Sequence, residues 1–339
     1  MPPLAPRLRP RLLPRLLPRA ATPRPYSSQE SPQLLVSNIK APSSGYVRLL
    51  ELNRPGARNA LSIELVSSLR REIEDVRSQY DAVDGTQVPL EDADGEELRR
   101  RPTRALVLAS AVDSCFCSGA DLKERRGFTK QQTTEFLSNL RATMEALSSL
   151  PIPTIAAISS VALGGGLELA LCTHLRVMTT NAKVGLPETR LAIIPGAGGT
   201  HRLADVIGKT RARDLILTGR RVSAPEAYFF GLADRLVELP PDDTTNGEES
   251  DSNSNSNKDD DSGARLLHTA RLAARSEAVR LALEICEGGP VAIRAAVEAV
   301  AAPSPLKEAD MYRRVVDTHD RNEALIAFQE KRKPVFRGS

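Results

Sequence analysis

The sequence contains no tryptophan, few other aromatic residues and only four cysteines in 339 residues. The cysteines Cys115, Cys117, Cys172 and Cys286 form no Cys-x-x-Cys pair and show no paired spacing of metal ligands. This usage argues against a disulfide framework and a metal site, and it favours a reducing compartment. No apolar run is long enough to span a bilayer, so we expect no membrane partner. With 41% hydrophobic residues, the chain can still bury one substantial core.

Acidic residues are absent from residues 1–29, where arginines alternate with leucines. This composition is typical of a mitochondrial transit peptide, which would direct the protein to the mitochondrial matrix. The prolines in the segment disfavour a stable amphipathic helix, so a disordered basic arm is the alternative. Without the segment, acidic residues outnumber basic ones, and the basic pI of 8.7 therefore does not indicate a nucleic-acid partner.

Short apolar runs alternate with helical stretches along the chain, a pattern that predicts an α/β fold. The expected strands are 47–52, 105–109, 154–158 and 175–179, and the expected helices are 63–77, 134–150, 264–287, 290–302 and 307–332. Two segments interrupt the pattern. Residues 81–101 form a polar, acidic insertion, and residues 240–263 form a low-complexity linker that we expect to be disordered. The predicted organisation is therefore a leader at 1–29, a core at 30–239, the linker, and a helical region at 264–339.

Three consecutive glycines lie between an expected strand and an expected helix in the stretch ALGGGLELAL at residues 162–171. Gly164, Gly165 and Gly166 lack a Cβ, so they allow a sharp turn and a close approach of another molecule to the main chain. The first N–H groups of a helix are unpaired and carry partial positive charge, which suits an oxygen that becomes negative during a reaction. Taken alone, the stretch also fits a tight packing turn or a phosphate site.

A second loop of the same kind follows the run at 105–109, in the stretch FCSGADLKE at residues 116–124. Gly119 and Ala120 stand at its turn, and Asp121 opens an expected helix. The two loops could converge on one carbonyl oxygen, although Asp121 could equally be an ordinary helix cap. Glu168 in the first loop, and Glu188 after Pro187, add two carboxylates; alone, each also fits a structural position.

Four motifs occur in order along the chain: RNAL at 58–61, FCSGADLKER at 116–125, ALGGGLELAL at 162–171 and IPGAGGTHRL at 194–203. With these motifs, the chain from about residue 46 onwards resembles the crotonase superfamily of enoyl-CoA hydratases and isomerases. LKER at 122–125 and AFQEKR at 327–332 most resemble its mitochondrial methylglutaconyl-CoA hydratase branch. The resemblance implies a spiral of repeated ββα units and a C-terminal helical region that forms trimers, with a hexamer as a dimer of trimers.

The resemblance also assigns roles to four residues. The N–H groups of Ala120 and Gly165 would form an oxyanion hole for the thioester oxygen. Glu168 would activate water and Glu188 would protonate Cα, although the two could exchange parts of this work. Because both glutamates are present, we expect hydration of a 2-enoyl-CoA. No separate cofactor is expected, since CoA is part of the substrate.

Further contacts to the substrate follow from the resemblance alone. The expected substrate-binding residues are Arg58, Ala60, Lys123, Gly164, Phe328 and Lys331. Lys123 would lie near the adenine and phosphates, whereas Phe328 and Lys331 would reach CoA on a neighbouring subunit. The alternatives are a solvated lysine and an ordinary amphipathic helix.

Branch resemblance favours conversion of 3-methylglutaconyl-CoA to 3-hydroxy-3-methylglutaryl-CoA in leucine degradation over short-chain enoyl-CoA hydration in β-oxidation. The distal carboxylate of the first substrate needs a cation, for which Arg126, Arg190 and Lys209 are candidates. An RNA-binding homologue is a further alternative, but the helix at 63–77 is nearly balanced in charge. Three departures from the branch are Ser159-Ser160, where Asp-Gly is usual, His174, where aspartate is usual, and His201, where glutamine is usual. We interpret His174, His201, His268 and His319 as structural.

Overall fold

The computed structural model describes residues 31–81, 85–88, 102–239 and 255–339. The predicted leader at 1–29, most of the insertion at 81–101 and the linker residues 240–254 lie outside the described residues. Within the described ranges, no helix is long and apolar enough to cross a membrane.

Two sheets form the core of the chain. The larger has the order β1-β2-β3-β5-β7-β10, in which the β1–β2 pair is antiparallel and the other pairs are parallel. The smaller has the order β4-β6-β8-β9, in which β8–β9 is the antiparallel pair. The strands are β1 Leu34–Lys40, β2 Tyr46–Leu52, β3 Thr103–Ser110, β4 Cys115–Cys117, β5 Thr154–Ile158, β6 Val161–Leu163, β7 Leu175–Thr179, β8 Lys183–Gly185, β9 Arg221–Ser223 and β10 Arg235–Val237.

The chain alternates between the sheets in a repeating way. β3, β5 and β7 belong to the larger sheet, and each is followed by a strand of the smaller sheet and then by a helical segment. This is the predicted spiral of ββα units. The helical segments are η1 Pro55–Ala57, α1 Ile63–Ser78, α2 Leu122–Arg125, α3 Lys130–Ser148, α4 Gly165–Leu171, η2 Glu188–Leu191, α5 Gly199–Ile207, α6 Lys209–Thr218 and α7 Ala224–Phe230.

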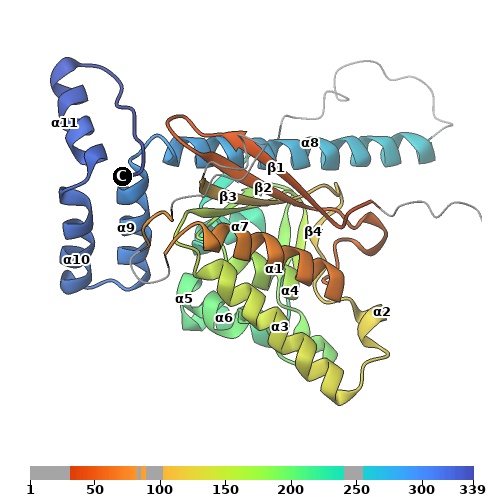
Figure 1. Cartoon of the computed structure of the whole chain (residues 1–339). Helices are drawn as coiled ribbons and strands as arrows, with labels where there is room; N and C mark the ends of the chain where they lie inside the picture. The colour runs from red at the N-terminus through yellow and green to blue at the C-terminus, as the bar shows by residue number, and fades with distance from the viewer. Residues whose placement is uncertain (1–30, 82–84, 89–101, 240–254) are drawn as a thin grey trace, which may run out of the picture. The chain divides into compact units, whose positions relative to one another are not determined.

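Both faces of the larger sheet are buried. In β2, Val47 and Leu49 point to one core, while Leu50 and Leu52 point to the other, as the period of two along a strand requires. Helix α8 (Asn255–Ile285) covers the first face, and α1 and α3 lie on the opposite side (Figure 1). Burial on both faces explains why the strands read as continuous apolar runs.

Helix α8 lies on the sheet through small side chains. Its buried residues include Ala274, Ala278 and Ala282, which recur every four residues and therefore share one helix face. Alanine at these positions lets the helix axis come close to Val107 and Ile155 of the sheet, both of which belong to the same core cluster.

The C-terminal helices differ from the prediction in two places. α8 begins at Asn255 rather than at 264, so residues 255–263 are helical where disorder was expected, because adding residues to an existing helix costs less than starting a new one. The single helix expected at 307–332 is in fact two, α10 (Pro305–Val316) and α11 (His319–Glu330). Thr318 adopts extended geometry and caps α11 by accepting a hydrogen bond from Arg321 N. Between α8 and α10 lies α9 (Pro290–Ala301).

The turn between β5 and β6 contains Ser159 and Ser160, which are buried. Neither has a positive φ, so this turn forms without the freedom of glycine. Their carbonyl oxygens accept hydrogen bonds from Thr179 Oγ1 and Lys183 N, at 2.9 and 3.1 Å. These contacts tie the turn to the next repeat of the spiral.

We predict that Gly166→Ala destabilises the fold. A Cβ at Gly166 would lie 2.2 Å from the carbonyl oxygen of Cys117, so backbone must move to admit it. Overpacking of this kind costs about 1 to 3 kcal/mol or more. Urea denaturation measures the loss, and Gly127→Ala is the control because its Cβ meets open space. Equal denaturation midpoints for the two variants would contradict the close contact.

Candidate active site

A cavity of about 590 Å³ lies where the two glycine loops meet. Ala120, Gly165, Glu168 and Glu188 all line it, so the structure brings the four predicted reaction-centre residues together. Much of the remaining wall is apolar. The apolar lining includes Leu122, Leu137, Leu140, Leu191, Ile193 and Ile194.

The backbone around Ala120 turns its N–H towards the cavity. Leu61 N donates to Gly119 O at 2.8 Å, and Asp121 N donates to Leu61 O at 3.3 Å, which forms a parallel bridge between Leu61 and Ala120. In such a bridge the residues on either side of Ala120 bond to Leu61, and the N–H of Ala120 itself points away from Leu61. A Cβ built on Gly165 would lie 3.6 Å from Ala120 N, so the two loops are in close contact.

Among the described residues, neither the N–H of Ala120 nor that of Gly165 donates to a protein acceptor. Gly165 is the first residue of α4, where helix N–H groups have no partner in the helix. A Cβ on Gly119, which has φ of +99°, would lie 3.3 Å from Gly165 N. The two donors are therefore near neighbours and available to one ligand oxygen.

Glu168 is buried and held in one orientation. Its Oε1 accepts hydrogen bonds from Ala197 N and Gly199 N, both at 2.8 Å. Burial raises the pKa of its carboxyl, and the two N–H groups reduce this rise. One oxygen is thus fixed by the backbone, which leaves the other for chemistry in the cavity.

Glu188 begins η2 and lies against the first glycine loop. A Cβ on Gly164 would lie 2.9 Å from Glu188 Oε1, so only glycine allows this approach. Glu188 Oε2 is buried and has no hydrogen-bond partner among the described residues. Burial raises the pKa of Glu188 to about 7, with a contribution from the negative charge of Glu168. A carboxyl with this pKa can both give and accept a proton near neutral pH.

Two arginines hold the loop that contacts Glu168. Arg141 Nε donates to Gly196 O at 2.6 Å, and Arg202 Nη1 donates to Ala197 O at 3.1 Å. Arg202 is itself held by an ion pair with Glu145 at 2.8 Å. Arg141 holds the peptide between Gly196 and Ala197, whose N–H binds Glu168, and Arg202 holds the next peptide of the same loop.

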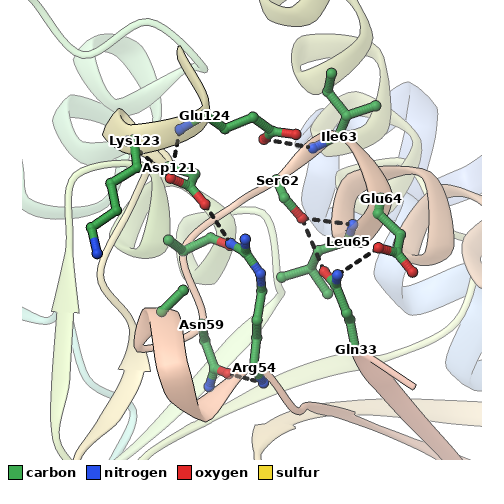
Figure 2. A network of polar contacts seen from close by, with 12 residues as sticks. Gln33, Arg54, Asn59, Ser62, Ile63, Glu64, Leu65, Asp121, Lys123 and Glu124 are labelled. Carbon is green, nitrogen blue, oxygen red and sulfur yellow. Dashed lines mark hydrogen bonds and ion pairs between the residues drawn. The ribbon is translucent and has the colours of Figure 1, made fainter. Parts of the chain in front are cut away.

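A polar network supports the other loop, as Figure 2 shows. Arg54 Nη1 lies 2.6 Å from Asp121 Oδ2 and also donates to Ala60 O at 2.9 Å. Asp121 Oδ1 accepts from the N–H groups of Lys123 and Glu124, both at 3.0 Å. The interpretation of Asp121 as a helix cap is therefore confirmed, and its ion pair with Arg54 is an addition that the sequence did not show.

The same network reaches α1. Glu124 Oε2 accepts from Ile63 N at 3.2 Å, and Ser62 caps α1 by accepting from Leu65 N at 3.1 Å (Figure 2). The oxyanion-type loop is thus anchored to the start of a long helix. Partial burial opposes ionisation of Asp121, but hydrogen bonds from Glu124 N and Arg54 outweigh it and lower its pKa.

Of the six predicted substrate-binding residues, only Gly164 lines the cavity within the described part of the chain. Arg58 has φ of 51°, and its carbonyl oxygen accepts from Ser118 N at 3.1 Å, so its backbone supports the loop of Ala120. The Lys123 side chain extends away from the Arg54–Asp121 pair (Figure 2). Their contacts with CoA stay predictions.

The two residues predicted to reach a neighbouring subunit lie at the end of α11. Phe328 is 82% exposed, and Lys331 caps the helix with φ of 54°. Both lie outside the cavity lining. An exposed phenylalanine on a helix is consistent with a surface that another copy covers.

The candidate cations for the acyl group lie outside the lining of this cavity. Arg126, Arg190 and Lys209 do not line the cavity; Arg190 Nε instead donates to Thr218 O at 3.0 Å. The lining cations among the described residues are Arg125 and Arg141.

A pattern in the sequence places Arg141 on the same helix face as two other residues that line the cavity. Thr133, Leu137 and Arg141 recur every four residues on α3, and all three line the cavity. This helix face could have been recognised only once Leu137 was known to face a site.

His174 lies away from the cavity and has a structural contact. Its Nδ1 accepts from Thr154 N at 3.1 Å, and its own N–H donates to Thr154 Oγ1 at 2.9 Å. Burial lowers its pKa. The structural interpretation of this histidine is supported.

Comparisons with known proteins agree with this geometry. Residues 95–246 match the family model described as enoyl-CoA hydratase/isomerase. A mitochondrial methylglutaconyl-CoA hydratase 1 of Pyricularia oryzae is 60% identical over 94% of this chain and 90% of its own length. An enoyl-CoA isomerase/hydratase of Zymoseptoria tritici is 50% identical, with 92% and 91% covered.

Among solved structures, the enoyl-CoA hydratase from Bacillus anthracis is 36% identical, with a TM-score of 0.69 over 90% of this chain and 99% of that one. The chain therefore belongs to the enoyl-CoA hydratase/isomerase family, the crotonase superfamily indicated by its motifs.

We predict that Arg54→Met lowers turnover without unfolding the protein. The change removes the ion pair that anchors Asp121, so the loop that carries Ala120 loses one constraint. Small displacements in a reaction centre cost up to about 100-fold, and we expect a loss of about 10- to 100-fold in kcat/KM. Arg70→Met is the control, because it removes a half-exposed pair with Glu74 on α1. Equal turnover in both variants would show that the pair does not position the loop.

We predict that Glu188→Gln stabilises the protein at high pH relative to low pH. Because the folded state binds this proton more tightly than the unfolded chain, the free energy of unfolding falls as the pH rises from about 4.5 to about 7. Glutamine has no such titration. The stability difference between variant and parent should therefore shift by roughly 2 kcal/mol in favour of the variant between pH 5 and pH 8. Denaturation at both pH values measures it; a difference independent of pH would contradict the raised pKa.

Proposed function

We propose that the protein hydrates the double bond of a 2-enoyl-CoA thioester. The observation that carries this proposal is the presence, in one cavity, of two unpaired N–H groups and two buried carboxyl groups. Isomerisation needs proton transfer alone, whereas hydration also needs a water held for attack on Cβ. Two carboxyl groups suit a shared water.

In the proposed mechanism, the thioester oxygen accepts hydrogen bonds from Ala120 N and Gly165 N. Glu168 takes a proton from water, whose oxygen attacks Cβ, and the electrons of the double bond move towards the thioester oxygen. The resulting enolate is stabilised by the two N–H donors, each worth roughly 3 to 4 kcal/mol. Glu188, with a pKa of about 7, then supplies the proton that Cα needs. The product is a 3-hydroxyacyl-CoA.

For the acyl group we propose 3-methylglutaconyl-CoA, which would give 3-hydroxy-3-methylglutaryl-CoA in leucine degradation. The support is the name of the relative that is 60% identical to this chain. Short-chain enoyl-CoA hydration in β-oxidation is the second candidate, because another relative carries the broader name enoyl-CoA isomerase/hydratase.

We propose the mitochondrial matrix as the location, supported by the basic, acid-free segment 1–29 and by the mitochondrial name of the same relative. A homo-oligomer, a hexamer as a dimer of trimers, is proposed from family resemblance, and α10 and α11 expose Leu306, Tyr312 and Phe328. No cofactor is proposed beyond the CoA of the substrate.

An RNA-binding role has little support. On α1, Arg70 is paired with Glu74, while Glu72 and Asp75 hold Arg48 of the neighbouring strand β2. Phosphate binding needs clustered positive charge, and on α1 only Arg71 and Arg77 form no ion pair among the described residues, on a helix that also carries Glu64, Glu72, Glu74 and Asp75.

We predict that the purified chain hydrates 3-methylglutaconyl-CoA with a higher kcat/KM than crotonyl-CoA, because of the relative's activity. Loss of the absorbance of the conjugated thioester measures both rates. Glu168→Gln and Glu188→Gln should each lower kcat by about 100- to 10,000-fold with the fold retained, since each removes a proton-transferring group.

Circular dichroism of the two variants is the control for folding. Preference for crotonyl-CoA would support the second candidate. Near-normal turnover in either glutamine variant would remove that glutamate from the mechanism, and failure to turn over any 2-enoyl-CoA would sink the hydratase proposal.

A further inference from the structure

The cavity contains an electrostatic feature that the proposed mechanism does not use. Its lining has four charged side chains among the described residues: Glu168, Glu188, Arg125 and Arg141. The glutamates serve the proposed water and proton steps. The mechanism assigns no role to the arginines, although both come from the α2–α3 side of an otherwise largely apolar wall.

Arg141 is held in place while most of its hydrogen-bonding capacity is unused. Its Nε donates to Gly196 O at 2.6 Å, which fixes the plane of the guanidinium group. Within the described ranges this is its one hydrogen bond, and it forms no ion pair with a carboxylate, although its charge reduces the rise that burial causes in the pKa of Glu168. A guanidinium has five N–H donors in a planar fork, so its two terminal nitrogens can still bind a carboxylate by two parallel hydrogen bonds.

Arg202 shows that an arginine can hold this loop while its own charge is paired with a carboxylate. It also holds this loop, through Ala197 O, but its charge is compensated by Glu145 at 2.8 Å. Arg141 has no equivalent partner among the described residues. Arg141 is an exposed residue whose charge acts on Glu168 without forming an ion pair with it, so its guanidinium group is available to an anionic ligand in the cavity.

Arg125 provides a second positive charge at the same cavity. Its guanidinium lies 5.6 Å from the ring centroid of Phe136, which orients it, and no carboxylate of the described residues pairs with it. Two cations from separate helices in the lining of one cavity favour the binding of an anionic group there.

We propose that Arg141, assisted by Arg125, binds the distal carboxylate of the acyl group and thereby selects carboxylated enoyl-CoA substrates. This inference rests on the proposed function. In 3-methylglutaconyl-CoA the carboxylate is attached to the carbon next to Cβ, so its partner must lie inside the cavity. Arg125 and Arg141 meet this condition, whereas Arg126, Arg190 and Lys209 do not.

The test compares glutaconyl-CoA with crotonyl-CoA, which differ only in a carboxylate on C4. We predict that Arg141→Leu lowers the ratio of their kcat/KM values by about 10- to 100-fold, the range expected for a charge-assisted hydrogen bond. Any disturbance of Glu168 through Gly196 affects both substrates and cancels in the ratio. Arg141→Lys should retain part of the preference, because it keeps the charge but not the fork.

The matched control is Arg126→Leu, which removes the same charge one residue from Arg125 but outside the cavity. Its ratio should stay within twofold of the parent. Should Arg141→Leu lose all turnover, the binding of glutaryl-CoA and butyryl-CoA by calorimetry carries the test, since these saturated analogues also differ by a carboxylate. If Arg141→Leu weakens the binding of glutaryl-CoA but not that of butyryl-CoA, the proposal is supported.

Two results would overturn the inference and can be told apart. If the parent prefers glutaconyl-CoA and Arg141→Leu keeps that preference, the carboxylate binds elsewhere and the proposed function stands. If the parent itself shows no preference for glutaconyl-CoA, both the carboxylate site and the choice of 3-methylglutaconyl-CoA fail, while hydration of crotonyl-CoA would leave the hydratase proposal intact.

Discussion

Close backbone contact between two glycine loops is the constraint on which the candidate site depends. A Cβ on Gly166 would lie 2.2 Å from Cys117 O, so no side chain fits there, and a Cβ on Gly119 would lie 2.8 Å from Leu163 O and 3.3 Å from Gly165 N. Because of this contact, the N–H groups of Ala120 and Gly165 lie side by side although 45 positions of sequence separate the residues. The spiral makes the approach possible, since β4 and β6 are neighbours in the smaller sheet and each loop follows one of them.

The two glutamates occupy environments that differ in a useful way. Backbone N–H groups bind one oxygen of Glu168, which favours its charged form, whereas Glu188 has a buried oxygen that receives no hydrogen bond from the part of the chain that the structure describes. Burial opposes ionisation at both positions, but only Glu188 lacks backbone N–H donors from another loop to offset it. Different environments of this kind separate a proton acceptor from a proton donor. The orphaned oxygen of Glu188 also destabilises the folded state, which is a common consequence of building a reactive group.

Much of the fold was predictable because burial leaves a strong sequence pattern. The strands at 154–158 and 175–179 agree residue for residue, since parallel strands covered on both faces are largely apolar, with Arg176 as the buried charged exception. Helix ends were less predictable: α3 begins at Lys130, four residues before the expected start, because Thr129 and Gln132 form a capping box in a polar stretch. The break before α11 depends on Thr318, whose capping role is invisible in a long helical pattern.

In the candidate site, too, some residues could be predicted from the local sequence, whereas others depend on how distant elements pack. Gly165 and Asp121 were found from motifs, because the role of each residue depends on the backbone conformation of its own loop. The cations that line the cavity, Arg125 and Arg141, were not, because their position depends on how α2 and α3 pack beside the cavity rather than on any neighbour in sequence. Arg126 and Arg125 are adjacent, yet only Arg125 lines the cavity. On a helix, successive residues point about 100° apart, so a motif that names a basic segment does not say which of its charges reaches the ligand.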